Sequence, residues 1–143
     1  VKEKAISENN NIVIVSAAIE SQIAEFESKE EKLELLKDLG LNETTLKKLI
    51  NAGYSILNLI TYFTCGPKET RAWTIKKKTT APKAAGKIHT DFEKGFIRAE
   101  TVAYSDFIEF GGEIASRDAG KLRQEGKEYI VKDGDVMHFL FNV

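Results

Sequence analysis

The chain has 143 residues, of which 42% are hydrophobic and 30% charged, with a net charge of −1 at pH 7. This composition predicts a folded protein and excludes disorder over the whole chain. Its apolar runs are shorter than the roughly 20 residues of a membrane-spanning helix, so we expect no membrane partner. One cysteine, Cys65, excludes an internal disulfide, and we expect a reducing, cytoplasmic compartment.

We expect the chain to be part of a longer protein, because it begins at Val1 rather than Met. Its apolar residues in the first half mostly follow helical spacing. Residues 12–15 are four consecutive β-branched residues, which predict a strand buried on both faces, as in a parallel α/β sheet. A helical stretch follows from residue 17. Another begins at a capping box on Ser28 and ends at Gly40. Asn42 is expected to cap the next helix.

The second half changes to strand periodicity. Residues 59–65 and 71–77 predict two strands joined by a turn at Gly66-Pro67, because they are rich in Ile, Thr, Tyr, Phe and Trp. A short helix starting at Pro82, a strand over 97–104 and a helical piece from Ser105 follow. Two strands are expected over 127–131 and 136–143, with Asp133-Gly134-Asp135 as the turn between them. This order predicts an α+β fold of β-grasp type, with domains at 1–57 and 58–143.

No catalytic constellation stands out in this sequence, which disfavours an autonomous enzyme. The glycine-rich phosphate-binding patterns are absent from the 143 residues, and one cysteine with two histidines gives little basis for a zinc site. His89 and His138 are expected to be structural. Ser105 with Asp106 is interpreted as a helix cap, and Cys65 as a small apolar residue at a strand end rather than a reactive thiol.

Charge is unevenly distributed along the chain. Residues 68–98 carry nine basic and three acidic side chains, whereas the segments on either side are both net acidic. Such a segment can bind phosphates, and interleaved aromatic rings can stack on bases. For Trp73, Phe92 and Phe96 we favour the ordinary interpretation, in which they belong to the core. The candidate RNA- or ribosome-binding residues are Arg71, Lys76, Lys77, Lys78, Lys83 and Lys87.

Three long strings carry a family resemblance. Residues 62–75 (YFTCGPKETRAWTI), residues 80–100 and residues 126–136 resemble the C-terminal part of the YchF/Obg-like ATPases, a P-loop family in the Obg group of translation-factor GTPases. The resemblance covers nearly the whole chain. It implies that residues 58–143 are a TGS domain, a β-grasp module, and that residues 1–57 are the last strand and helices of the nucleotide-binding α/β domain.

The resemblance also implies a function for the parent protein. Ser16-Ala17-Ala18 resembles the fifth GTPase motif, whose backbone borders the nucleotide base, with Ala18 in place of the usual lysine. The parent is expected to hydrolyse ATP or GTP with Mg²⁺, whereas this chain, without a phosphate loop, is expected to hold no cofactor and to be inactive. The residues that set the preference between ATP and GTP are expected upstream of Val1.

Two functional hypotheses follow for the chain itself. The leading one is a non-catalytic module that helps a nucleotide-driven switch engage the ribosome or RNA. The alternative is a regulatory module that binds a small molecule or another protein. A continuous basic face would favour the first, and a deep apolar pocket with few polar groups would favour the second.

Overall fold

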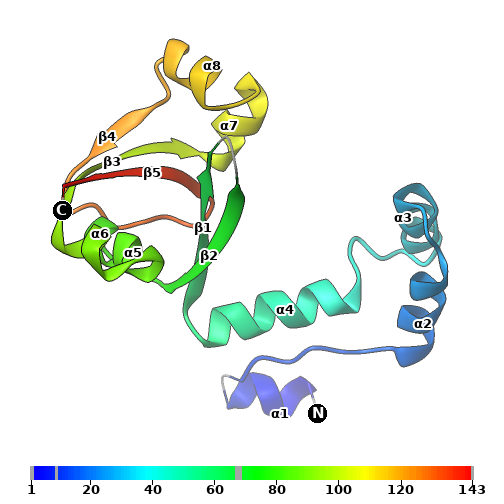
Figure 1. Ribbon diagram of the computed structural model, residues 1–143. Helices are drawn as coiled ribbons and strands as arrows, with labels where there is room; N and C mark the ends of the chain where they lie inside the picture. Colours follow the sequence, from blue (N-terminus) through cyan, green and yellow to red (C-terminus); the bar gives the residue numbers. More distant parts are fainter. Residues whose placement is uncertain (1, 9, 67–68, 143) are drawn as a thin grey trace. The chain divides into compact units, whose positions relative to one another are not determined.

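The computed structural model describes residues 2–8, 10–66 and 69–142 (Figure 1). The chain forms two compact units, unit 1 over Val1–Leu57 and unit 2 over Asn58–Val143. Among the described residues, none of the helices is both long and apolar enough to cross a membrane.

Unit 1 is helical. Ser28 caps the third helix as predicted, since its hydroxyl accepts a hydrogen bond from the Glu31 backbone N–H at 3.1 Å, and Gly40 follows the helix end with a φ of +66°. The fourth helix is capped by Thr44, whose hydroxyl accepts from the Lys47 N–H at 3.2 Å; the prediction of Asn42 as its cap is wrong because the helix starts later. The helices are α1 (Lys2–Ser7), α2 (Ala17–Glu25), α3 (Lys29–Asp38) and α4 (Thr45–Ile56).

Residues 12–15 do not form the buried strand that their β-branched run predicts. The structure assigns no regular secondary structure to residues 10–16, and Ile14 and Val15 are 63% and 57% exposed. A strand exists only when a neighbouring strand satisfies its backbone N–H and C=O groups. The described part of unit 1 contains helices but no such neighbour, so the segment stays unpaired.

Unit 2 is built on one five-stranded sheet with the order β2-β1-β5-β3-β4. The neighbouring strands β1 and β5 are parallel, with Phe63 opposite Val136, and the other neighbouring pairs are antiparallel. A mixed sheet of this order, crossed by one helix after the first hairpin, is the β-grasp arrangement, which confirms the predicted fold class. The strands are β1 (Leu59–Cys65), β2 (Thr70–Lys76), β3 (Phe96–Ala103), β4 (Arg123–Glu125) and β5 (Asp135–Phe141).

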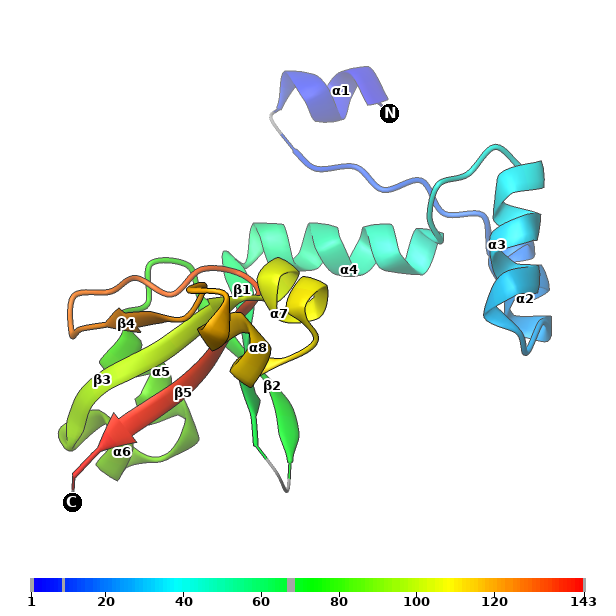
Figure 2. The same cartoon turned by 90° about the horizontal axis from the view of Figure 1, so that it is seen from above.

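The core of unit 2 lies between this sheet and one helix, α5, as the two views of Figures 1 and 2 show. Three alanines of α5, Ala81, Ala84 and Ala85, are completely buried, which lets the helix backbone approach the sheet. The hydroxyl of the buried Tyr62 donates to the Ala84 carbonyl at 2.8 Å. The helices of unit 2 are α5 (Ala81–Ile88), α6 (Thr90–Lys94), α7 (Tyr104–Phe110) and α8 (Glu113–Asp118).

The strand predicted over residues 127–131 is wrong, because the strand before β5 lies earlier, at β4. Residues 127–131 instead pair with the segment that leads into α5. The Ala81 N–H donates to the Tyr129 carbonyl at 2.8 Å, and the Val131 N–H donates to the Thr79 carbonyl at 3.0 Å. The turn expected before the last strand is present at Gly134, where φ is +82°. Pro67, placed in the predicted hairpin turn, lies outside the described residues.

Candidate nucleic-acid interface

Three consecutive lysines project from the turn between β2 and α5. Lys76 is the last residue of β2, and all three side chains are exposed. The turn backbone is held by the Lys77 N–H, which donates to the Asn58 carbonyl at 2.7 Å, and by the Thr79 hydroxyl, which donates to the Lys76 carbonyl at 2.6 Å. Lys78 has a φ of 68°, a conformation uncommon outside glycine. The turn is therefore a defined structure that directs Lys76, Lys77 and Lys78 into solvent.

Two further lysines lie on the solvent side of α5. Lys83 and Lys87 are four residues apart and so share one helix face, while Ala84 and Ala85 turn toward the core. Within the described residues, none of the five lysines forms an ion pair with a carboxylate, so their charges remain available to a ligand. We call these residues the lysine face: Lys76, Lys77, Lys78, Lys83 and Lys87.

Arg71 does not belong to the lysine face. It stands at the other end of β2, five residues from Lys76, which is roughly 16 Å along an extended strand. Its guanidinium lies 4.3 Å from the centre of the Trp73 ring and 4.0 Å from a carboxylate oxygen of Glu69. Five of the six sequence-predicted residues are thus on or next to α5, and Arg71 is apart from them.

The aromatic residues of the basic segment pack inward, as predicted. Phe96 is buried, and Trp73 and Phe92 pack against the core cluster. The Trp73 indole N–H donates to the Thr64 hydroxyl at 2.9 Å, and the Phe92 ring stacks on Phe141 with centroids 3.8 Å apart. The lysine face therefore offers positive charge for phosphates rather than open rings for stacking on bases.

The two histidines lie at a helix cap and at an exposed strand position. His89 caps α6, since its Nδ1 accepts from the Asp91 N–H at 3.2 Å, and His138 is exposed on β5. The parts of the chain that the structure describes contain no group of three His, Cys, Asp or Glu side chains able to hold a metal ion.

Ser105 is not the helix cap that the sequence predicts. Helix α7 starts one residue before it, with Ala103 at the capping position, and Asp106 pairs with Lys121 at 3.7 Å. The Cys65 sulfur lies 3.3 Å from the Thr70 hydroxyl at the end of the β1–β2 hairpin. In the described part of the chain, no hydrogen bond joins Ser105 or Cys65 to a histidine.

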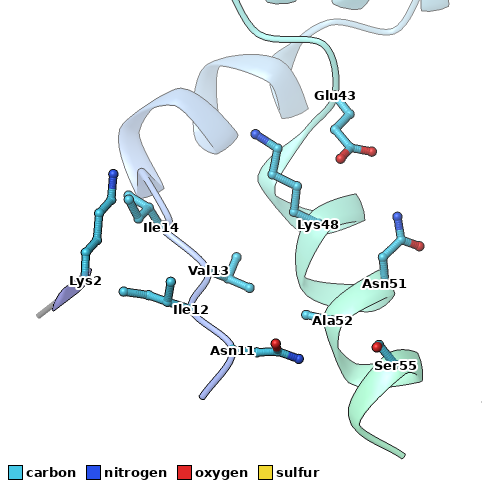
Figure 3. Close-up of a pocket in the computed structure, with 10 residues that line it drawn as sticks. All are labelled: Lys2, Asn11, Ile12, Val13, Ile14, Glu43, Lys48, Asn51, Ala52 and Ser55. Carbon is cyan, nitrogen blue, oxygen red and sulfur yellow. The ribbon is translucent and has the colours of Figure 1, made fainter. Parts of the chain in front are cut away.

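The predicted base-side loop lies at the start of α2. Ser16 is the capping residue in extended conformation, and its side chain makes no capping hydrogen bond; Ala17 and Ala18 are exposed. A hollow of about 600 Å³ opens nearby between residues 11–14 and α4, but none of the three residues lines it (Figure 3). Its lining residues are Lys2, Asn11, Ile12, Val13, Ile14, Glu43, Lys48, Asn51, Ala52 and Ser55.

Sequence reasoning missed one buried polar cluster in unit 2. Asp135 is 2% exposed, and its carboxylate accepts hydrogen bonds from the Tyr129 hydroxyl at 2.7 Å and the Lys132 N–H at 2.8 Å, with the Arg123 guanidinium 3.5 Å away. Burial, followed by the hydrogen bond to Asp135, raises the pKa of Tyr129 to about 12. The cluster fastens residues 126–134 to β5, which is a structural role. Its only sequence signal was the pair of aspartates around Gly134.

A family model matches most of unit 2. The model YchF-GTPase_C, described as "Protein of unknown function (DUF933)", matches residues 59–142. The chain is 62% identical over all its 143 residues to the ribosome-binding ATPase YchF of Haemophilus influenzae, and 57% identical to the protein of that name from Bacillus subtilis. Obg-like ATPase 1 of Gallus gallus is 52% identical over 131 residues, which are 92% of this chain and 33% of that protein.

The chain spans 39% of the length of the two bacterial relatives. It covers a similar share of the solved structures that it resembles. The YchF GTPase of Schizosaccharomyces pombe superimposes with a TM-score of 0.80 at 44% identity, over 96% of this chain and 37% of that one. A GTP-binding protein of Pyrococcus horikoshii OT3 has a TM-score of 0.66 at 18% identity, over 98% of this chain and 40% of that one, and so shares the fold alone.

Proposed function

The chain belongs to the YchF family, and we propose that it is the C-terminal part of a ribosome-associated P-loop ATPase or GTPase. The observation that carries the proposal is the 62% identity, over the whole chain, to a protein named a ribosome-binding ATPase. In this proposal unit 2 is a TGS domain, unit 1 is the tail of the nucleotide-binding domain, and the protein is cytoplasmic.

Within this role, the lysine face of unit 2 contacts ribosomal or other RNA. Its five ammonium groups are exposed and unpaired in the described residues, and lysines bind phosphates as point charges. The acidic segments on both sides in the sequence repel polyanions, so binding is oriented by the lysine face rather than spread over the domain. Because the aromatic rings pack inward, we expect contact with the phosphate backbone and little discrimination between bases.

A salt titration tests the RNA contact. If about five phosphates are neutralised, the logarithm of affinity for single-stranded RNA falls with the logarithm of salt at a slope near −3.5, so a fourfold rise in salt weakens binding roughly a hundredfold. The triple variant Lys76→Ala, Lys77→Ala and Lys78→Ala flattens the slope by about 2. We expect its free energy of unfolding to change by less than about 0.5 kcal/mol, because these side chains are exposed.

A matched control removes the same charge from unit 1. Lys29, Lys32 and Lys37 lie on α3, and replacing them by alanine also removes three positive charges while leaving the lysine face intact. This variant should keep the wild-type slope. Binding of RNA and of ribosomal subunits that is unchanged in the lysine-face variant across the titration would show that these side chains are only solvated.

The residues of this chain do not by themselves fit a nucleotide. Its 143 residues contain no glycine-rich phosphate loop, and that loop supplies most phosphate contacts in P-loop proteins. Ser16, Ala17 and Ala18 offer one edge beside the base. We therefore propose that Mg²⁺ and ATP or GTP are held by residues of the longer protein. Titration calorimetry of the 143-residue chain with ATP and GTP should show no binding, and micromolar affinity would contradict this.

A small regulatory molecule is the alternative partner. Two hollows, of about 600 and 660 Å³, are open to solvent instead of being enclosed, and each lies within one unit. Enclosure normally buries most of a small ligand's surface, so these shapes favour a macromolecular partner over a small one.

A further inference from the structure

Unit 2 has a groove on the face of the sheet opposite α5. Side chains alternate between faces along a strand, so Cys65 of β1 and His138 of β5 point away from the core side that holds Tyr62 and Met137. Together with α7 and α8 they line an open groove of about 660 Å³. The side chains that matter in its walls are those of Phe107, Glu113, Ile114 and Asp118.

The corner that forms one wall of the groove is held rigidly. The completely buried Ser116 donates its hydroxyl hydrogen to the Gly112 carbonyl at 2.7 Å within the first turn of α8, and the same hydroxyl lies 3.4 Å from the Asp106 carbonyl of α7. The guanidinium of Arg117 lies 3.2 Å from a Glu100 oxygen and 3.1 Å from a Glu113 oxygen, and so ties α8 to β3. Gly111 has a φ of +81°, which permits the sharp chain reversal. The groove is therefore preformed, and a ligand would not have to order it.

Its apolar wall is unusually open to solvent. Ile114 is 74% exposed although it lines the groove, and Ile108 on the outside of the same corner is 59% exposed. Apolar side chains that gather on an exposed concave surface are typical of interaction sites. Phe107 extends this apolar wall toward the sheet.

The charge of the groove is opposite to that of the lysine face. Among the described lining residues, the carboxylates of Glu113 and Asp118 are present and no lysine or arginine is. Residues 104–118 carry four acidic side chains and one basic one, Arg117, which is already paired. An anionic surface repels nucleic acid and attracts cationic groups.

We propose that this groove binds a protein segment in which an apolar side chain is flanked by lysine or arginine residues. The apolar side chain lies against Ile114 and Phe107, and the flanking cations approach Asp118 and the Glu113 carboxylate oxygen that Arg117 does not bind. This inference goes beyond the RNA contact, because the surface, its charge and the class of partner all differ. Unit 2 then engages two partners of opposite charge through opposite sides of its sheet.

A peptide titration of the 143-residue chain tests the proposal. The probe is a fluorescein-labelled peptide of alternating lysine and leucine, compared with matched peptides in which glutamate replaces lysine or serine replaces leucine. Fluorescence anisotropy should show saturable binding of the lysine–leucine peptide, at least about tenfold tighter than of either matched peptide. Backbone amide shifts should change at Phe107, Ile114 and Asp118 and remain constant at Lys83 and Lys87.

Two variants locate the contact, each with a control on the same corner. Ile114→Ser should weaken binding about fivefold and Asp118→Lys about tenfold, because they remove the apolar contact and reverse the local charge. Ile108→Ser and Glu109→Lys also change an isoleucine and an acidic residue, but outside the groove lining, and should leave affinity within about twofold. An unchanged amide spectrum away from α8 shows that a variant is folded.

Other outcomes would overturn the proposal. Equal peptide affinity in all four variants would show that the peptide does not bind in the groove. Groove amide shifts produced by a labelled RNA would assign the groove to nucleic acid, and shifts that grow with protein concentration without peptide would assign it to a second copy of the chain. Loss of RNA binding in the lysine-face variant with retained peptide binding separates this inference from the proposed RNA contact.

Discussion

Unit 2 packs its apolar side chains into one core, whereas unit 1 leaves most of its own exposed. In unit 2 the sheet, α5 and the segment before β5 bury residues such as Tyr62, Met137 and Phe139. In the described part of unit 1, Ile23 and Leu36 are the only buried apolar side chains. Its exposed large apolar residues are Ile6, Ile12, Ile14, Val15, Leu33, Leu39, Leu46, Leu49, Ile50, Tyr54, Ile56 and Leu57.

The difference shows which unit can be stabilised by its own residues. Burial of apolar surface is the main favourable contribution to folding, at about 25 cal/mol per Å². Unit 2 gains this contribution from its own residues, and unit 1 gains little of it within the chain. We therefore expect unit 2 to be the cooperative folding unit and unit 1 to open locally at low cost.

Hydrogen exchange should show the largest contrast between the units. Val13 and Val15 belong to no strand, so their amides should exchange near the rate of an unfolded peptide. The amides of Phe139 and Phe141 lie in β5, which has a strand on each side, and should exchange at least about a thousandfold more slowly through global unfolding. Equal protection of both sets in a monomer would contradict the comparison.

Matched alanine substitutions in the two units should differ in their effect on the free energy of unfolding. Phe139→Ala removes a ring buried against Tyr62 and Phe96, and should cost about 3–4 kcal/mol. Leu33→Ala removes a side chain that is 63% exposed in α3, and should cost less than about 0.5 kcal/mol. Urea unfolding followed by circular dichroism measures both. A cost for Leu33→Ala as large as that for Phe139→Ala would mean that unit 1 has a core of its own.

The buried cluster at Asp135 makes the stability of unit 2 sensitive to alkaline pH. The pKa of Tyr129 is about 12 in the folded chain against 10 for an unperturbed tyrosine. The neutral phenol is therefore favoured by folding, a contribution fully present below pH 10 and lost as pH rises from 10 to 12. Tyr129→Phe should lower the free energy of unfolding by about 1.5 kcal/mol at pH 8, because it deletes a hydrogen bond to a carboxylate.

The pH dependence distinguishes this effect from loss of packing. The difference between wild type and Tyr129→Phe should shrink between pH 10 and pH 12. Tyr104→Phe is the control, since Tyr104 is exposed on α7 and its ring contact with Phe63 survives the change. A constant difference across this range would show that the Tyr129 hydroxyl does not contribute through its proton.

Removing unit 1 should have the smallest effect on the free energy of unfolding of unit 2. Residues 58–143 contain every strand of the sheet and the whole core cluster, so this segment should fold alone. Its free energy of unfolding should lie within about 0.5 kcal/mol of the value for the 143-residue chain. Residues 1–57 alone should show no cooperative unfolding transition. A segment 58–143 that unfolds without unit 1 would show that the two units depend on each other.

Local patterns in the sequence were enough for much of unit 2. Alternating β-branched and aromatic residues predicted β1, β2 and β3, and Pro82 marked the start of α5. These signals succeed because strand pairing across a hairpin and the start of a helix depend on residues near in sequence. The long strings of residues 62–75, 80–100 and 126–136 also identified the family that the comparisons show. The roles assigned to Ser16, Ala17, Ala18, Arg71 and the lysine face stay predictions.

Contacts between segments far apart in the sequence determined the features that local sequence patterns did not predict. Residues 12–15 have the composition of a buried strand, yet the described part of unit 1 holds no strand that pairs with them. Residues 127–131 bond to the segment before α5 instead of joining the sheet. The groove beside Ile114 likewise brings together residues of β1, of α7 and α8, and of β5, which are far apart along the chain. By itself the sequence determined the family, the order of most elements and the position of the charge. Only the tertiary structure decided which backbone and side-chain groups find partners, because a hydrogen bond or a buried contact requires both of its members in place.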